Sequence, residues 1–314
     1  LLGFSGSITL LALTIFAYRL PALNSSKLVV TGSKESFLSM NNILMITSIF
    51  SIFLGVTYPL IIESISGEKV SIGPPYYNTI FAPLILIAAV FIMISVNALW
   101  QRSMPLRALF VTTSAPTMLS LLSLYLIWHA TNIFSILAYI GIFSGLLILF
   151  SYLLRTLVNV FNKKFINKGS AIAHIGLGLL FLAVSMNSIL SYEKNLNLAP
   201  GQSISVNESV REFSFNDIQV FQASNHDVIS AQVSLLQDGR EIALNPQKRK
   251  YATRGQITSE SAIHASVLKD TYLTIGDQLE NGSWTFSLRI NYFIKWIWFS
   301  ATLMVLGMLL TIFK

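Results

Sequence analysis

Seven apolar stretches of about 20 residues recur along the chain. At 1.5 Å per residue, each is long enough to cross about 30 Å of hydrocarbon as an α-helix. They cover residues 3–21, 43–63, 79–100, 106–128, 131–154, 170–191 and 291–313. Two connections between them are very short, so the helices that they join are expected to be antiparallel neighbours. This pattern predicts an α-helical polytopic membrane protein with about seven transmembrane helices.

A polar segment separates the sixth and seventh stretches, and its hydrophobic period is two. Apolar and polar residues alternate in Ser203–Val206, Phe213–Val220 and Ala231–Leu236, as expected of half-buried strands. Asp238-Gly239 and Asn281-Gly282 each lie between alternating runs, and both pairs favour the positive φ angles of type I′ hairpin turns. We expect a small all-β domain, either a sandwich or a partial barrel.

The predicted organisation therefore has three parts. They are a six-helix transmembrane region at 1–191, an extramembrane β-domain at 192–290 and a final transmembrane helix at 291–314.

Composition agrees with this architecture and excludes several classes of chemistry. Hydrophobic residues make up 53% of the 314 residues and charged residues only 11%, whereas a soluble domain carries roughly a quarter charged residues. The sequence has no cysteine, which excludes thiol catalysis, cysteine-ligated zinc, iron–sulfur clusters and disulfides. The sequence also lacks a Gly-rich phosphate loop and a His-Glu-x-x-His metal helix.

Basic residues set the expected orientation. If the N-terminal end of the first stretch is outside, ten basic residues fall in inner loops and the tail, and Lys69 alone falls in a short outer loop. The ten are Arg19, Lys27, Lys34, Arg102, Arg107, Arg155, Lys163, Lys164, Lys168 and Lys314. This positive-inside asymmetry predicts that the β-domain is outside, and it accounts for the net charge of +7 without a nucleic-acid partner.

Of the four histidines, His174 alone is expected inside a transmembrane helix. His129 is expected at the outer end of the fourth helix, and His226 and His264 in the β-domain. An ionisable group at membrane depth is costly and calls for a cavity, a partner or a ligand. Two interpretations stay open: His174 is an axial ligand of haem iron, or it hydrogen-bonds to a Ser or Asn of a neighbouring helix.

The haem interpretation has two geometric requirements. Gly176 and Gly178 lie just after His174 and would leave space beside it for a flat macrocycle. His129 is expected at the opposite membrane face, too far away to be the second axial ligand. That ligand must therefore come from another chain or from a part of the same protein outside this sequence.

An outer loop is the first candidate docking segment. Gly73-Pro74-Pro75 predicts a rigid turn, because the two prolines fix φ. Tyr76 and Tyr77 follow it. The segment is either an anchor at the membrane surface or a docking edge over an outward-facing cofactor.

The densest basic cluster is the second candidate docking segment. It comprises Lys248, Arg249, Lys250 and Tyr251, in the expected β-domain. Such a run is either a solvated face or a set of donors for carboxylates, whether porphyrin propionates or acidic residues of a partner.

Nine short segments, considered together, carry a resemblance. They are Ser33-Lys34-Glu35, Gly55–Leu60, Ser71–Asn78, Ala173–Gly176, Ala199–Gly201, Pro246–Tyr251, Thr258–Ile263, Asp270–Gly276 and Trp296–Gly307. Their order and spacing resemble the C-terminal half of the CcmF family, the integral-membrane component of the cytochrome c haem lyase. The family pattern has Ser-Arg-Glu where this chain has Ser33-Lys34-Glu35, a change that keeps the charge.

This resemblance implies an activity and a cofactor. The family joins haem vinyl groups to the thiols of a Cys-x-x-Cys-His motif in apocytochrome c, on the outer face of a bacterial inner membrane or a mitochondrial inner membrane. His174 matches the intramembrane histidine that is one of two axial ligands of a resident haem b. The implied partners are the N-terminal half of the lyase, a haem chaperone, an apocytochrome-handling subunit, apocytochrome c and membrane lipid.

Parts of the family pattern are not found in this sequence. The Trp-rich segment that holds the incoming haem, two outer histidines and the first intramembrane histidine belong to the half that would precede Leu1. We therefore expect a fragment or one half of a split lyase, which cannot attach haem alone. A transporter or export subunit, and an assembly subunit without a cofactor, are the alternatives.

Overall fold

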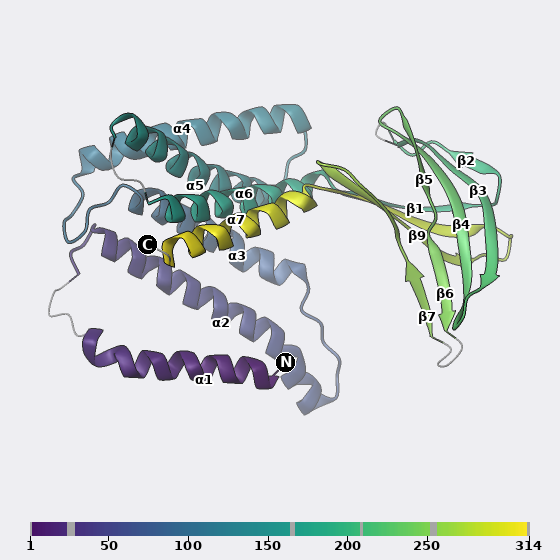
Figure 1. The fold of residues 1–314 in the computed structure, drawn as a ribbon, viewed down its shortest axis with the longest axis horizontal. Coiled ribbons are helices and arrows are strands. Elements are labelled where there is room, and N and C mark those ends of the chain that lie inside the picture. The colour runs from purple at the N-terminus through teal and green to yellow at the C-terminus, as the bar shows by residue number, and fades with distance from the viewer. Residues whose placement is uncertain (1, 24–28, 164–166, 208–209, 252–255, 313–314) are drawn as a thin grey trace.

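The computed structural model describes residues 2–23, 29–163, 167–207, 210–251 and 256–312. Within these residues, helices precede and follow a β-rich segment (Figure 1). The helices are α1 (Leu2–Arg19), η1 (Leu20–Leu23), α2 (Lys34–Ser66), α3 (Pro74–Ser95), α4 (Leu106–Thr131), α5 (Ile136–Phe161), α6 (Lys168–Leu190) and α7 (Ile294–Ile312).

Six of these helices, α2 to α7, are long and apolar enough to cross a membrane. The apolar part of α1, Gly6–Arg19, is shorter. Successive helices run in opposite directions, so the loops after α2 and α4 lie on the side of the β-rich segment (Figure 1). The expected membrane architecture is confirmed.

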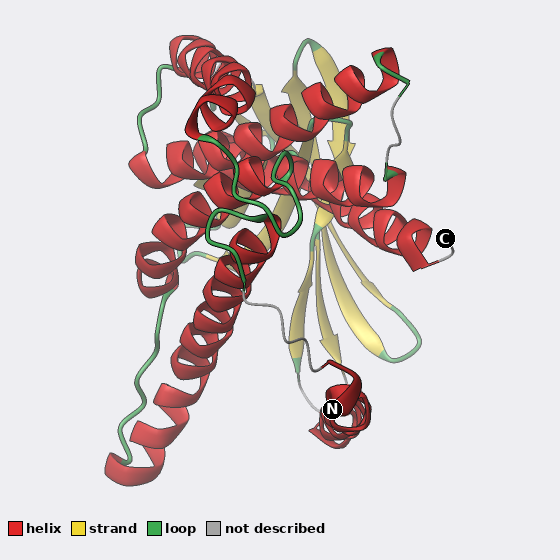
Figure 2. Cartoon of the chain, turned by 90° about the vertical axis from the view of Figure 1, so that its left-hand side faces the viewer, coloured by secondary structure: helices red, strands yellow, loops and turns green. Residues whose placement is uncertain are grey.

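The helices pack unevenly. α6 contacts both α5 and α7 extensively, and α3 packs on α5. A buried apolar cluster lies where α3, α5 and α6 meet, and it includes Ile92, Ile148, Tyr152 and Ala171. By contrast, α1 stands apart from the other helices in two perpendicular views (Figures 1 and 2).

The segment between α6 and α7 is a β-sandwich. Its strands are β1 (Tyr192–Leu198), β2 (Gln202–Ile204), β3 (Val210–Gln222), β4 (His226–Gln237), β5 (Arg240–Leu244), β6 (Gln247–Tyr251), β7 (Ile257–Glu260), β8 (Ala262–Ala265), β9 (Lys269–Gln278) and β10 (Trp284–Tyr292). One sheet has the order β1-β10-β9-β8, and the other has β2-β3-β4-β6-β7 with β5 paired to β4. All of the pairs are antiparallel.

The alternation seen in the sequence builds the core of this sandwich. Phe213 and Phe215 project from β3 toward Phe286 of β10, and all three are buried. The ring centroids of Phe215 and Phe286 are 4.9 Å apart in an edge-to-face arrangement, which aromatic pairs favour. Of the two predicted forms, the chain adopts the sandwich.

The two predicted hairpin turns differ in outcome. Asp238 and Gly239 form the two-residue loop between β4 and β5 with φ angles of 49° and 75°, as a type I′ turn requires. Asn281-Gly282 also lies in a hairpin, but the type I′ prediction is wrong there. The loop runs from Leu279 to Ser283, and only Gly282 in it has positive φ. The Asn281 side chain instead accepts a hydrogen bond from the Ser283 backbone, which holds a wider turn.

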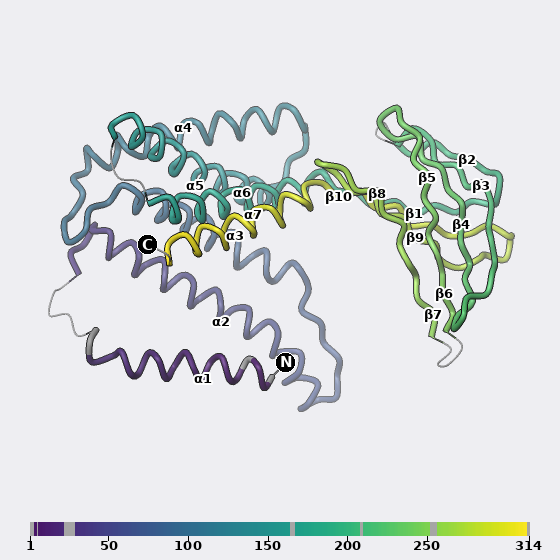
Figure 3. Tube along the Cα trace, viewed as in Figure 1, coloured from purple at the N-terminus to yellow at the C-terminus, as the bar shows by residue number. Residues whose placement is uncertain are grey.

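Both covalent connections to the sandwich run side by side. β1 follows α6 after Ser191 alone, and β10 precedes α7 with only Phe293 between them. β1 and β10 are paired from Tyr192–Ile290 to Leu198–Trp284. Ser191 Oγ donates to Asn187 Oδ1 at 2.6 Å and accepts from the Tyr292 backbone at 3.1 Å. The result is a narrow connection between helices and sandwich (Figure 3).

Candidate functional site

His174 lies two turns into α6, half-buried among the helices. Its Nδ1 is 2.8 Å from the carbonyl oxygen of Ser170, four residues earlier. A carbonyl can only accept a hydrogen bond, so Nδ1 carries the proton in the neutral ring. The lone pair is then on Nε2, to which no hydrogen bond is formed in the described part of the chain. Nε2 is therefore the nitrogen that could ligate a metal.

Tyr152 of α5 fixes the plane of this imidazole. The two ring centroids are 4.4 Å apart, and the planes are 13° from parallel. Tyr152 is itself buried, so one face of the His174 ring is covered by a rigid neighbour. The other interpretation is a hydrogen bond from His174 to a Ser or Asn of a neighbouring helix. In the described residues the ring bonds to a serine, Ser170, but through its backbone and on the same helix.

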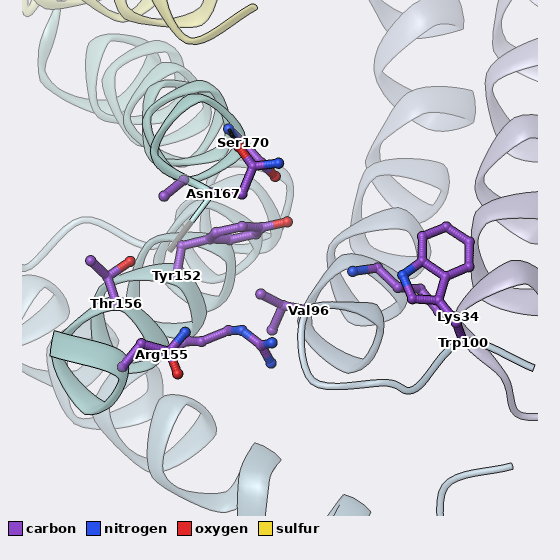
Figure 4. Close-up of a pocket in the computed structure, with 10 residues that line it drawn as sticks. Lys34, Val96, Trp100, Tyr152, Arg155, Thr156, Asn167 and Ser170 are labelled. Carbon is purple, nitrogen blue, oxygen red and sulfur yellow. Dashed lines mark hydrogen bonds between the residues drawn. The ribbon is translucent and has the colours of Figure 1, made fainter. Parts of the chain in front are cut away.

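A polar cavity of about 300 Å³ opens beside this pair. It is lined by Lys34, Val96, Trp100, Tyr152, Arg155, Thr156, Asn159, Asn167, Ser170 and Ala171. Figure 4 shows Lys34 and Trp100 on one side and Tyr152, Arg155 and Asn167 on the other, with Val96 between them. Tyr152 and Ser170 contact His174 as well, so the cavity and the imidazole share a wall.

Local sequence explains how Lys34 reaches the cavity. Ser33 caps α2 by accepting a hydrogen bond from the Ser36 backbone at 3.3 Å, which starts the helix at Lys34. The Glu35 carboxylate accepts from the Gln101 backbone at 2.9 and 3.0 Å. This contact holds the loop between α3 and α4, and the Lys34 ammonium lies 5.4 Å from the Trp100 ring centroid. The segment Ser33-Lys34-Glu35 thus builds one side of the cavity.

Arg155 builds the other side. Its Nη1 donates a hydrogen bond to Asn97 Oδ1 at 2.7 Å. Because Arg155 is three residues after Tyr152 on α5, both side chains lie on one face of that helix. This hydrogen bond joins α5 to the segment that follows the end of α3.

These residues fit part of a haem site. An imidazole with a free Nε2 could supply one axial ligand, and two cations could pair with carboxylates. The volume of about 300 Å³ is at the lower end for small-molecule pockets, which span roughly 300–1,000 Å³. The chain therefore offers one axial position and one polar edge, and the remainder of a haem would need other surroundings.

The predicted role of Gly176 and Gly178 as space beside a haem is wrong. A Cβ on Gly176 would lie 2.9 Å from the Ser300 carbonyl oxygen of α7, and one on Gly178 would lie 2.8 Å from the Gly145 carbonyl oxygen of α5. Neighbouring helices occupy that space. The two glycines permit close helix packing, as small residues do in membranes.

The predicted rigid turn at Gly73-Pro74-Pro75 is also corrected. Gly73 is the N-cap of α3, and the two prolines form its first turn, where proline is well tolerated. The Tyr76 hydroxyl donates to the Ser51 carbonyl of α2 at 3.2 Å. Tyr76 thus joins α2 to α3 instead of lying free as a docking edge.

The basic cluster on β6 divides between two faces. Lys248 and Lys250 line a hollow of about 560 Å³ between the sheets, where Lys248 pairs with Asp277 of β9. Strand alternation directs Arg249 and Tyr251 to the opposite face. Arg249 contacts Glu260 at 3.6 Å, and the Tyr251 ring lies 5.1 Å from His226. The four residues do not form one continuous donor surface.

The other histidines are distant from His174 along the fold. His129 is in the last turn of α4, at the opposite end of the helices from the start of α6 (Figure 1). His226 begins β4 and His264 lies on β8. In the described residues, no group of three or more His, Cys, Asp or Glu side chains could hold a metal ion.

Sequence reasoning misses Tyr152, Trp100 and Asn97. It uses Arg155 only as a topology signal, and Lys34 only as a topology signal and as part of the resemblance in Ser33-Lys34-Glu35. A usable signal existed for one contact, because Ser170 and His174 are four residues apart and share a helix face. Nothing local linked Lys34 to Arg155, which are far apart in the sequence.

Comparison with known proteins shows what this chain is similar to. Residues 189–292 match the family model described as CcmF C-terminal beta-sandwich. The cytochrome c-type biogenesis protein CcmF of Pseudomonas fluorescens is 31% identical over 314 residues, which cover 95% of this chain and 46% of that protein. CcmF of Pseudomonas aeruginosa is 27% identical, with coverage of 94% and 46%. The chain thus spans about half the length of these curated relatives.

A solved structure has the same fold. It is named Cytochrome c Heme Lyase CcmF and matches with a TM-score of 0.69 at 17% identity, covering 88% of this chain and 45% of that one. Together with the sequence matches, it confirms the resemblance found in the sequence. Over nearly its whole length, this chain is similar to about half of the length of CcmF proteins.

Proposed function

We propose that this chain is the C-terminal membrane part of a haem lyase for cytochrome c maturation, and that His174 supplies one axial ligand to a resident haem b. One observation carries the proposal: His174 Nδ1 is fixed by Ser170, which leaves Nε2 free on a ring held by Tyr152 beside a polar cavity. The relatives named for cytochrome c biogenesis and the haem lyase fold support it.

The chain's own residues hold and orient the ligand. Haem, when bound, supplies a redox-active iron. The Ser170 carbonyl sets the tautomer of His174, and hydrogen bonding at the distal nitrogen raises the basicity of a ligating imidazole. Tyr152 restricts ring rotation and shields one face from water. Because both contacts are already formed, the His174 ring does not have to reorient to bind a metal.

The sandwich is the docking part of the proposed lyase. Among the described residues, the ends of α1 and α5 and the starts of α2, α4 and α6 lie away from the sandwich (Figure 1), and they carry the basic residues Arg19, Arg155, Lys34, Arg107 and Lys168. By the positive-inside rule, the sandwich then faces the periplasm or intermembrane space. Apocytochrome c or a haem chaperone would meet the chain there, and the N-terminal half of the lyase would supply the second iron ligand.

Absorption spectroscopy of the chain co-purified with a CcmF N-terminal half tests the axial ligand. His174→Ala should abolish the haem Soret band, whereas His129→Ala should leave it unchanged, because His129 is at the other end of the helices. Added imidazole should restore a band to His174→Gly, which separates loss of a ligand from misfolding. Unchanged haem content and spectrum in His174→Ala would exclude the ligand role.

A further inference from the structure

The described lining of the polar cavity has two cations and no acidic side chain. Lys34 and Arg155 are both half-buried, and no Asp or Glu lines the cavity in the residues that the structure describes. The nearest acid in sequence, Glu35, attracts Lys34 electrostatically, but it does not line the cavity, and its carboxylate accepts hydrogen bonds from the Gln101 backbone. Burying unpaired charge is costly. Two cations in a cavity whose described lining holds no carboxylate therefore point to an anionic ligand.

Neither cation is free to turn away. The Arg155 guanidinium is held by Asn97, and the Lys34 ammonium by the Trp100 ring. Both are directed from opposite sides toward Val96 (Figure 4). The Arg155 contact uses one of five N–H donors, so the others can bind a carboxylate in bidentate fashion. The site is preorganised for an anion that reaches both side chains.

The start of α6 adds to the positive electrostatic potential in the cavity. Asn167, Ser170 and Ala171, at the beginning of this helix, line the cavity. The first backbone N–H groups of a helix and its dipole favour negative charge. This contribution is independent of the two cations and has the same sign.

The cavity is continuous with the surroundings of His174. Ser170 accepts the Nδ1–H hydrogen bond of His174, and Tyr152 stacks on its ring. Both residues also line the cavity. An anionic group in the cavity would therefore lie close to the two residues that hold the His174 ring.

We propose that Lys34 and Arg155 bind the propionate carboxylates of the haem whose iron His174 ligates. This inference rests on the proposed function. Haem has a metal for the imidazole and two carboxylates on one edge, which match one nitrogen ligand and two cations. The phosphate of an anionic lipid is the other source of negative charge at this depth, and the experiment distinguishes it.

Haem b and its dimethyl ester provide the test, because esterification removes both carboxylate charges and leaves the iron. The co-purified complex, stripped of haem, is titrated with each form and followed by Soret absorbance. The wild-type complex should bind the diacid at least about tenfold more tightly than the diester, since hydrogen bonds to charged groups are worth this factor or more. The double variant Lys34→Gln/Arg155→Gln should lose this preference.

Two further variants act as controls. Arg155→Lys keeps the charge and should retain most of the preference. Arg107→Gln removes a cation at the exposed start of α4, outside the cavity, and should leave the preference unchanged.

The outcomes separate the two proposals. If diacid and diester bind equally to the wild type through His174, the propionate role is wrong and the axial ligand stands. If neither form gives a His174-dependent band, the proposed function is wrong and takes this inference with it. If the double variant keeps the diacid preference but loses bound anionic lipid in native mass spectrometry, the cavity holds a lipid phosphate and the inference is overturned.

Discussion

Glycine residues are the closest contact points between the helices around His174. Gly145 of α5 and Gly178 of α6 face each other, so that a Cβ on either would lie within 2.8 Å of the other's carbonyl oxygen. Gly169 and Gly307 make the same kind of contact between α6 and α7. These positions keep the His174 helix between two neighbours, where small residues permit close backbone approach.

Enlarging one of these glycines should separate α5 from α6. We expect Gly178→Leu to lower stability by about 1–3 kcal/mol, as overpacking a tight contact does. Gly6→Leu is the matched control, because nothing lies within 4 Å of a Cβ there. Thermal unfolding in detergent, followed by tryptophan fluorescence, compares them. Equal midpoints for the two variants would contradict the packing role of Gly178.

The same residues illustrate a limit of sequence reasoning. His174 could be selected from the sequence because an ionisable group inside an apolar run is conspicuous. The meaning of Gly176 and Gly178 depends on which helix packs against them, and α5 and α7 are selected by tertiary structure. The position of Lys34 opposite Arg155 across the cavity likewise depends on a loop that Glu35 holds. Neither feature has a local pattern.

Among the elements, β1 and β10, the strands next to the helices in sequence, carry a cross-strand ion pair. Glu193 and Arg289 are register partners, and the Arg289 guanidinium binds the Glu193 carboxylate. Ser287 donates to the same carboxylate at 3.0 Å. The hydrogen bond from Arg289, followed by that from Ser287, lowers the pKa of Glu193 below its ordinary value of 4.5.

This shift predicts a pH dependence of stability. A carboxylate whose pKa is lowered by folding stabilises the native state above its unfolded pKa, and the contribution is lost as pH falls below about 4.5 toward the folded pKa. The effect should be small, because the pair is exposed. Melting curves of residues 189–292 between pH 3 and 7 test it. Glu193→Gln should lack this component, and an identical pH profile in the variant would refute it.

Local sequence patterns predicted those helices and turns whose structure depends on nearby residues alone. Apolar runs gave the helices, and Asp238-Gly239 gave a two-residue turn because both residues tolerate positive φ. Asn281-Gly282 has the same letters, but the Asn281 side chain bonds to Ser283 and a wider loop results. Gly73-Pro74-Pro75 predicts a turn but starts α3, because proline starts helices as readily as it bends loops.

On the scale of the whole molecule, the sandwich has a core of its own. Its buried residues, from Leu196 to Ile290, all belong to the β-rich segment, and its two ends are paired strands. We expect residues 189–292 to fold cooperatively without the helices, with a free energy of unfolding of about 5–15 kcal/mol. Urea unfolding followed by circular dichroism measures it.

A core substitution calibrates that measurement. Phe213 is fully buried against Phe286, so Phe213→Ala should cost about 3–5 kcal/mol. A broad, non-cooperative transition of the wild-type segment would show that the sandwich needs the helices to fold.

The narrow connection at Ser191 determines where a mechanical load would travel. One residue separates β1 from the helix that carries His174, and its hydroxyl ties that helix to β1 and β10 together. A protein that pulls or twists the sandwich applies force first to α6 and α7, to which the sandwich is joined by single residues. The force reaches the other helices through their packing against these two. Torque applied on one side of the bilayer is thereby delivered to the helix that holds the imidazole.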